Sequence, residues 1–153
     1  MTEVANRQAG LLTRLERAFN PRTVAVIGDK RAIGYMWLNS MSTFAGKLYS
    51  VQVDPNEIAG IEAMGVTNYK SLAEIPDEVD YAVCAVPRPV AARIIADCIA
   101  KKVGAVSLFT SGFAETETEE GIKAQEQITQ MAREAGLLLI GPNCMGIYNR
   151  RLG

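Results

Sequence analysis

The sequence predicts an α/β fold built on one parallel, doubly wound sheet. Short apolar runs rich in β-branched residues alternate with helical patterns along the 153 residues, an order typical of parallel sheets. Each run ends in turn-forming residues such as Gly, Pro, Asp or Ser. The length suits one domain, in which roughly 68–70% of the unfolded chain's surface can be buried. We therefore expect a single Rossmann-like domain with three α/β/α layers.

The first elements follow from hydrophobic spacing. Residues 7–19 place apolar side chains every three or four positions, which predicts an amphipathic helix, and an Asn-Pro pair ends it. Residues 23–28 (TVAVIG) are typical of a strand buried on both faces. A helix over 34–46 and a strand over 48–55 are expected next, although residues 40–43 include weak helix formers.

The same alternation continues to the end of the chain. Region 56–79 is expected to hold a short helix, a short edge strand and a helical turn. Strands are then predicted at 80–87, 105–112 and 137–142, and helices at 89–102 and 116–135. The run Thr116-Glu117-Thr118-Glu119 fits a capping box at the start of the last helix, and Gly136 ends that helix.

Composition excludes several functional classes. The net charge of −1 favours neither nucleic acid nor an anionic membrane, and no run approaches the about 20 apolar residues of a membrane span. With no basic, apolar export signal and three cysteines, we expect a cytoplasmic protein. Cys84 and Cys98 are interpreted as packing residues, since no metal-binding spacing joins the cysteines.

The absence of histidine restricts the chemistry further. The chain has no His, which removes Ser-His-Asp and Cys-His nucleophilic sites and the commonest transition-metal ligand. We therefore expect no metal site and no His-dependent nucleophilic site, and we name no catalytic residue in this chain.

Turn-forming residues gather at the predicted carboxyl ends of the strands, where doubly wound sheets bind ligands. They are Gly28-Asp29, Asp54-Pro55, Pro87-Arg88, Ser111-Gly112 and Gly141-Pro142-Asn143. Glycine and proline also end most strands without any ligand. Five such turns on one edge nevertheless favour a binding site.

The choice of ligand is not settled by the first turn. The dinucleotide fingerprint is missing, because Lys30 stands where its second glycine would be and Gly34 is the next glycine after Gly28. No Walker A sequence is present either. Asp54 stands where an NAD-binding domain has its ribose-binding acid, but Asp-Pro is also a common turn opener. NAD therefore remains an alternative ligand.

Five stretches together resemble a known family. They are PRTVAVIGDKRAIG, VQVDPNEIAG, SLAEIPDEVDYAVCAVP, TSGFAETETEEG and LIGPNCMGIYN. In this order they resemble the coenzyme A (CoA) binding domain of NDP-forming acyl-CoA synthetases, such as the succinyl-CoA synthetase α subunit and ADP-forming acetyl-CoA synthetases. The resemblance covers residues 20–153, so we divide the chain into an N-terminal helical segment, 1–20, and a CoA-binding domain, 21–153.

The resemblance implies that CoA lies across the strand ends. The residues implied to contact it are Gly28, Ile33, Gly34, Val53, Pro55, Val86 and Pro87, with Ser111 and Gly112 further along the same edge. A bulky residue at Gly34 is expected to crowd the first turn. Asn143 is placed by the resemblance at the edge of the active site, and Cys144 is interpreted as a buried small residue.

Three positions depart from the family pattern. The usual Gly-Ala-Ser of the first turn is Gly28-Asp29-Lys30, the usual Asn before Pro55 is Asp54, and the usual Ala after Pro87 is Arg88. Lys30 and Arg88 are suited to compensate the two acids beside a polyanionic ligand. We therefore add Lys30, Asp54 and Arg88 to the candidate site, with a phosphate of CoA as the expected partner of Arg88.

The resemblance implies a CoA or acyl-CoA binding module of a larger synthetase. In that family a phosphorylated histidine on a later domain and an ATP-grasp domain perform the catalysis, so this chain is not expected to react alone. Its expected partners are the remaining synthetase domains or subunit, and a homo-oligomer is possible. Two alternatives remain: an NAD(H)-binding domain of an oxidoreductase or redox sensor, and a ligand-free structural or interaction domain.

Overall fold

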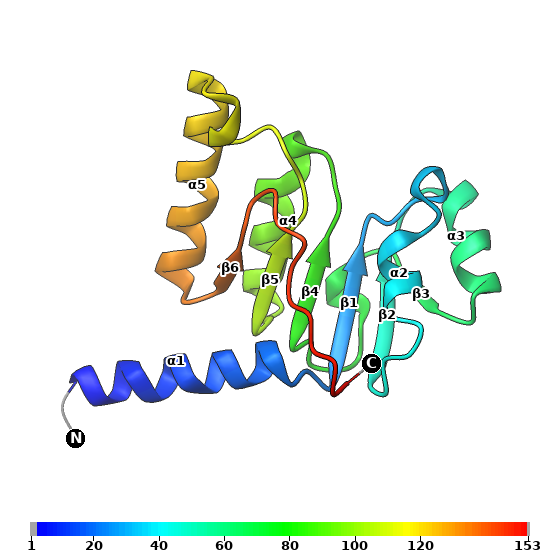
Figure 1. The fold of residues 1–153 in the computed structure, drawn as a ribbon, viewed down its shortest axis with the longest axis horizontal. Coiled ribbons are helices and arrows are strands. Elements are labelled where there is room, and N and C mark those ends of the chain that lie inside the picture. Colours follow the sequence, from blue (N-terminus) through cyan, green and yellow to red (C-terminus); the bar gives the residue numbers. More distant parts are fainter. Residues whose placement is uncertain (1–2, 153) are drawn as a thin grey trace.

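Six parallel strands form one sheet at the centre of the molecule (Figure 1). The computed structural model describes residues 3–152, with side chains from residue 9 onward. The strands are β1 (Thr23–Ile27), β2 (Lys47–Val51), β3 (Thr67–Tyr69), β4 (Tyr81–Cys84), β5 (Ala105–Leu108) and β6 (Leu138–Ile140). Their order, β3-β2-β1-β4-β5-β6, reverses direction between β1 and β4. The predicted doubly wound fold is confirmed.

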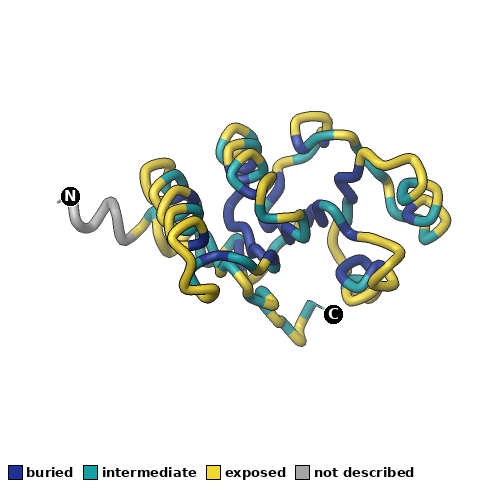
Figure 2. Tube along the Cα trace, turned by 90° about the horizontal axis from the view of Figure 1, so that it is seen from above, coloured by how far each residue is buried: buried dark blue, intermediate teal, exposed yellow. Residues whose placement is uncertain are grey.

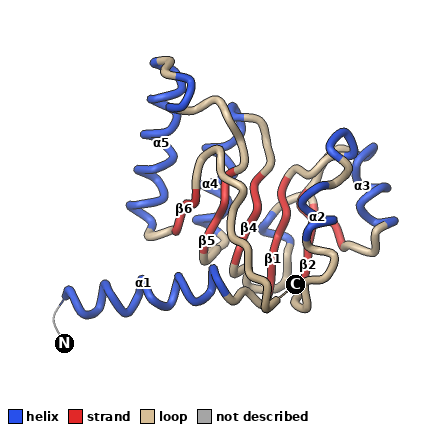
Figure 3. Tube along the Cα trace, in the orientation of Figure 1, coloured by secondary structure: helices blue, strands red, loops and turns tan. Residues whose placement is uncertain are grey.

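Helices cover both faces of this sheet, as Figure 3 shows. They are α1 (Glu3–Phe19), α2 (Met36–Ser40), α3 (Pro55–Ala63), α4 (Arg88–Ala100) and α5 (Glu119–Ala135). Helices α4 and α5 pack in the core of one face, whereas α2 and α3 pack in the core of the other. The predicted three layers are present, and none of the helices of the described residues is long and apolar enough to cross a membrane.

Strands β1, β4 and β5 are buried along their whole length, as their continuous apolar runs predicted. Figure 2 shows this buried centre between the exposed outer turns of the helices. Side chains alternate between the faces, so that Ala25 and Ile27 join the α4–α5 core while Val24 and Val26 join the other.

The segment 141–152 crosses the face of the sheet opposite α4 (Figure 3). The hydroxyl oxygen of Tyr81 on β4 accepts a hydrogen bond from the Ile147 N–H at 3.2 Å. A Cβ at Gly146 would lie 2.6 Å from the same hydroxyl, so the backbone passes directly over it. This segment therefore covers part of the face that α2 and α3 leave open.

Helix α1 lies along the amino ends of the strands, at the opposite edge from their turn-rich carboxyl ends (Figure 1). Near its end, Arg17 Nε donates to the Asp80 carboxylate at 2.7 Å. The same carboxylate accepts from the N–H groups of Arg22 and Thr23 at 2.9 and 3.2 Å. One acidic side chain before β4 thus fixes both α1 and the start of β1.

The helix expected over 34–46 is much shorter, because only Met36–Ser40 is helical. The Ser40 hydroxyl donates to the Met36 carbonyl at 2.7 Å, and two further hydroxyl residues follow within the next three positions. Such side chains compete for backbone hydrogen bonds and disfavour continued helix. The chain turns instead into β2.

The start of α5 also differs from the prediction. The N-cap is Thr118, whose hydroxyl oxygen accepts from the Gly121 N–H at 3.1 Å. A capping box needs Glu or Gln at position 121, where this chain has glycine, so only half of the motif forms. A Cβ at Gly121 would lie 2.3 Å from the Phe113 carbonyl oxygen, which explains the glycine. The predicted end at Gly136 is confirmed, with φ +69°.

Candidate functional site

A cavity of about 490 Å³ opens at the carboxyl ends of β1, β2 and β4, on the side of the sheet that α4 covers. We call it the switch-point cavity, because it lies where the strand order reverses. Its apolar lining includes Ile27, Val51, Leu72, Val86 and Ile94. Its charged lining consists of Lys30, Asp54, Glu57, Lys70, Arg93 and Asp97. An apolar pocket with a few polar groups is the usual form of a small-molecule site.

Half of the predicted site residues line this cavity. They are Gly28, Lys30, Val53, Asp54, Val86 and Pro87. The other six stand on the neighbouring turns outside it: Ile33, Gly34, Pro55, Arg88, Ser111 and Gly112. The contacts of these residues with a ligand remain predictions.

Sequence reasoning missed the wall formed by α4 and by the turn after β3. Val90, Arg93, Ile94 and Asp97 line the cavity from α4, at spacings of three and four residues that place them on one helical face. Lys70 lines it from the end of the edge strand β3. The sequence predicted this helix but not that its charged residues Arg93 and Asp97 line a cavity.

Gly28 is where the turns after β1 and β4 approach most closely. Its φ is +82°, and a Cβ there would lie 2.7 Å from Val86 Cγ1 and 3.1 Å from the Ala85 carbonyl oxygen. A side chain cannot be added without moving one of the two turns. Glycine at this position is therefore required by packing as well as by φ.

Gly34 has a different environment. It ends a short 3-10 turn with φ +67°, and a Cβ there would meet no atom within 4 Å. A Cβ at this position is therefore not crowded, and the weaker binding expected from a bulky residue stays a prediction. What remains is the backbone strain of a left-handed conformation.

Asp29 faces inward rather than toward a ligand. It is fully buried, and its carboxylate accepts from the Lys30 N–H at 3.0 Å and from the Leu38 N–H at 2.9 Å. Burial raises the pKa of this carboxyl, while the hydrogen bonds from Leu38, Lys30 and Trp37 act in the opposite direction. The acid thus holds the first turn onto the start of α2.

Asp54 caps α3. Its Oδ1 accepts from the Asn56 N–H at 2.9 Å and from Asn56 Nδ2 at 3.0 Å. The turn-opening role that we weighed against ribose binding is therefore present. Pro55 follows at the first helical position, where its missing N–H costs nothing.

Gln52 joins the first two turns, and sequence reasoning missed it. The side chain is buried, its Nε2 donates to the Asp29 carbonyl at 3.0 Å, and its Oε1 accepts from the Val53 and Asp54 N–H groups. No local pattern marks this glutamine, because its contact with Asp29, 23 positions away, forms only when β1 and β2 pair.

Arg88 joins the turns after β4 and β5. Its Nη1 donates to the Gly112 carbonyl oxygen at 2.6 Å, and its Nη2 lies 3.7 Å from the Glu120 carboxylate. Its ion-pair partner is therefore Glu120 and not Asp54, the acid of the second turn. The expected phosphate contact stays a prediction.

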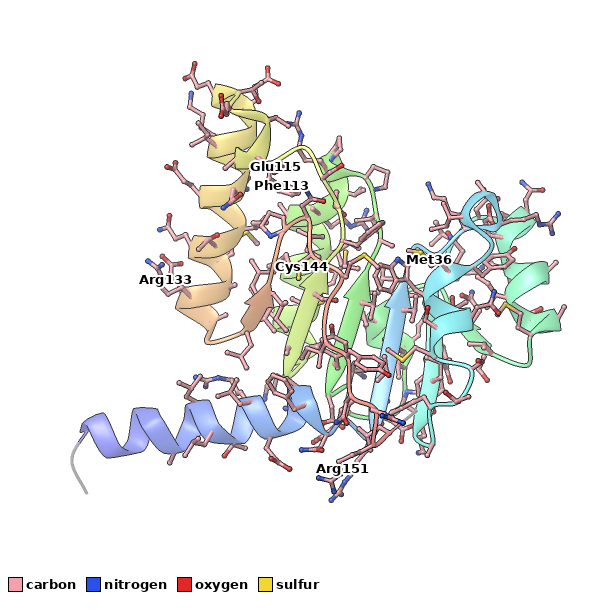
Figure 4. All side chains as sticks on the ribbon, in the orientation of Figure 1. Met36, Phe113, Glu115, Arg133, Cys144 and Arg151 are labelled. Atoms are coloured by element: carbon pink, nitrogen blue, oxygen red, sulfur yellow. The ribbon has the colours of Figure 1, made fainter. Side chains whose placement is uncertain are left out.

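Glu115 holds the turn after β5 together (Figure 4). Its carboxylate accepts from the Gly112 and Phe113 N–H groups at 2.6 and 3.0 Å. Desolvation alone would raise the pKa of this carboxyl, but the backbone hydrogen bonds and the nearby Arg88 lower it below its ordinary value.

The cysteines are not arranged for chemistry. Burial raises the pKa of Cys84 to about 12 and raises that of Cys98 as well, which supports the packing role predicted for both. Cys144 is half-buried near the carboxyl end of β5 (Figure 4), and its Sγ accepts from the Gly146 N–H at 3.4 Å. Within the described residues, no group of three or more acids and cysteines is placed to hold a metal ion.

Curated relatives share sequence with most of the chain. The α subunit of acetate–CoA ligase (ADP-forming) II from Pyrococcus furiosus is 39% identical over 139 residues. Trans-feruloyl-CoA synthase, from an unknown prokaryotic organism, is 35% identical over 141 residues. These matches cover 88% and 89% of this chain but only 29% and 19% of the relatives.

Solved structures and a family model agree with these matches. PH0766 from Pyrococcus horikoshii OT3 is 35% identical with a TM-score of 0.80, covering 90% of this chain and 31% of that one. Acetyl-coenzyme A synthetase 1 of Ca. Korarchaeum cryptofilum, solved with phosphate and ADP, is 34% identical with a TM-score of 0.75, covering 88% of this chain and 28% of that one. Residues 22–150 match the CoA binding domain family, and the chain therefore belongs to it.

Proposed function

We propose that this chain binds CoA or an acyl-CoA and serves as the CoA-binding domain of a larger ADP-forming acyl-CoA synthetase. The observation that carries the proposal is the switch-point cavity, which combines an apolar lining with three cationic side chains. Such a lining suits an adenine ring bearing phosphates. Membership of the CoA binding domain family supports the same ligand.

The proposed pose places the adenosine end of CoA in the cavity and leads the pantetheine arm away along the strand ends. The apolar residues Ile27, Val51 and Leu72 offer a surface for the adenine, with Val86 and Pro87 at the β4 end. The arm then passes the turn at Ser111 and Gly112, which Arg88 joins to the β4 turn. Ile33 and Val53 are both exposed beside this path.

The chain is not proposed to react alone. It contains no histidine, and it spans less than a third of the relatives and solved chains reported above. The proposed partners are therefore the remaining parts of a synthetase, which would supply the phosphoryl carrier and the nucleotide site. Its three free cysteines suit a reducing compartment, and the cytoplasm is the proposed location.

Titration calorimetry with CoA, acetyl-CoA and NADH in parallel tests the proposal. We expect saturable binding of CoA or acetyl-CoA at sub-millimolar concentration and none of NADH. Binding of NADH alone would establish the dehydrogenase-type alternative. No binding of any ligand would leave the structural or interaction domain.

A matched pair of variants locates the site. Val53 is 68% exposed and lines the cavity, so Val53→Trp is expected to obstruct the opening without disturbing the core. Ile122 is 41% exposed on α5, outside the cavity, so Ile122→Trp is the control. CoA affinity should fall in Val53→Trp only. Equal affinity in both variants would show that CoA does not bind in the switch-point cavity.

A further inference from the structure

The first turn has few backbone donors left for a phosphate. Its Lys30 N–H donates to the Asp29 carboxylate at 3.0 Å, and its Arg31 N–H donates to the Glu57 carboxylate at 2.8 Å. The N–H groups of residues 33, 34 and 35 donate to carbonyl oxygens of the same turn. Phosphates in doubly wound folds ordinarily use free N–H groups at this place. Here two acidic side chains of the protein already hold two of these donors.

The start of α4 also has few free backbone N–H groups for a phosphate. Its second residue is Pro89, which has no N–H, and the Val90 N–H donates to the Pro87 carbonyl at 3.0 Å. The Arg88 guanidinium, at the first position, is directed to Gly112. A phosphate in the switch-point cavity therefore has to rely on cationic side chains.

Two cationic side chains line the cavity from elements other than the first turn. Lys70 follows β3, and Arg93 lies one helical turn into α4, on the face that also carries Ile94 into the cavity. Both residues are exposed, and neither takes part in the ion pairs found among the described residues. Their charges are available to a ligand.

Among the described residues, the acidic groups of the cavity form no ion pair with these two cations. The Asp54 carboxylate caps α3, and the Glu57 carboxylate holds the first turn. Asp97 follows Arg93 by one turn on the same face of α4, without an ion pair to it within 4.0 Å. The Glu74 carboxylate accepts from the Lys70 N–H and from the Ser71 hydroxyl. The Asp54 and Glu57 carboxylates are thus already engaged by backbone N–H groups. Lys70 and Arg93 line the same cavity, and neither forms an ion pair among the described residues.

We infer that Lys70 and Arg93 form a phosphomonoester subsite that takes the ribose 3′-phosphate of CoA, so that this chain selects CoA over dephospho-CoA. The inference rests on the proposed function. A monoester phosphate carries a charge of about −1.5 to −2 near pH 7, and it branches from the ribose beside the adenine. The diphosphate instead continues along the pantetheine arm, toward the strand ends and away from Lys70.

Parallel titration of the whole chain with CoA and dephospho-CoA tests the inference. Hydrogen bonds to charged groups are strong enough that CoA should bind at least about tenfold more tightly than dephospho-CoA. Lys70→Gln and Arg93→Gln should each weaken CoA about tenfold while changing dephospho-CoA by less than about twofold. Lys123→Gln, an exposed lysine on α5 paired with Glu119, is the control and should change neither.

The possible results distinguish failure of the proposed 3′-phosphate subsite from failure of the proposed CoA binding. Equal affinity of the parent chain for CoA and dephospho-CoA would overturn the subsite and leave the proposed function standing. Equal weakening of both ligands in the Lys70 and Arg93 variants would also overturn it, because the two side chains would then act on a shared part of the ligand. Binding of neither ligand by a chain with a normal melting temperature would overturn both proposals.

Discussion

At Gly28 the turns after β1 and β4 pack so closely that a Cβ atom would clash with Val86. Gly28→Ala places a Cβ 2.7 Å from Val86 Cγ1 and at a φ of +82°. Strained backbone of this kind costs of order 1–3 kcal/mol, so we expect the free energy of unfolding to fall by about 2 kcal/mol or more. Urea denaturation measures the loss, and CoA affinity should fall because Val86 lines the cavity.

Gly34→Ala is the control for this prediction. Its φ of +67° imposes similar backbone strain, but its Cβ meets nothing within 4 Å. It should lose only about 1 kcal/mol. Equal losses in the two variants would show that the contact with Val86 contributes nothing.

At the scale of elements, α5 depends on its cap. Thr118→Ala removes the oxygen that accepts from the Gly121 N–H, and loss of such a cap costs about 0.5–2 kcal/mol. We expect a lower midpoint of urea unfolding. Thr118→Ser keeps the oxygen and should preserve most of the stability, and an equal loss in both would mean that the methyl group is what matters.

At the scale of the whole molecule, the chain is expected to stay unlabelled when incubated with radiolabelled ATP. It has no histidine to carry a phosphoryl group, and the described residues hold no metal-binding cluster. Autoradiography after denaturing electrophoresis measures this, with a complete ADP-forming synthetase as the labelled control. Stable label on an acid or a cysteine of this chain would contradict the prediction.

The order of the elements follows from the sequence because hydrophobic periodicity is local. Continuous apolar runs predicted the buried strands β1, β4 and β5, and even the loose region 56–79 holds the expected helix, edge strand and helical turn. The turn positions Gly28 and Pro87 were also predictable, because parallel strands bring their carboxyl ends to one edge, whereas Val86 was implied by the family resemblance. Some errors lay at helix ends, where the hydroxyl of Ser40 and the glycine at 121 outweigh periodicity. Others lay at strand ends, because the predicted strands 48–55, 80–87 and 105–112 included the turns that follow β2, β4 and β5.

Side-chain partners were decided only by the tertiary structure. Asp29 and Arg88 both follow strand ends in the sequence, yet one is buried against the start of α2 and the other reaches the β5 turn. Lys70 and Arg93 are 23 positions apart, and the pairing of β3 and the packing of α4 bring them to one cavity. The sequence by itself determined the sheet, the turn-rich edge at which the cavity opens, and the family. The side-chain contacts could not be predicted from the sequence, because a charged group interacts with groups within a few ångströms and only the tertiary structure brings those groups together.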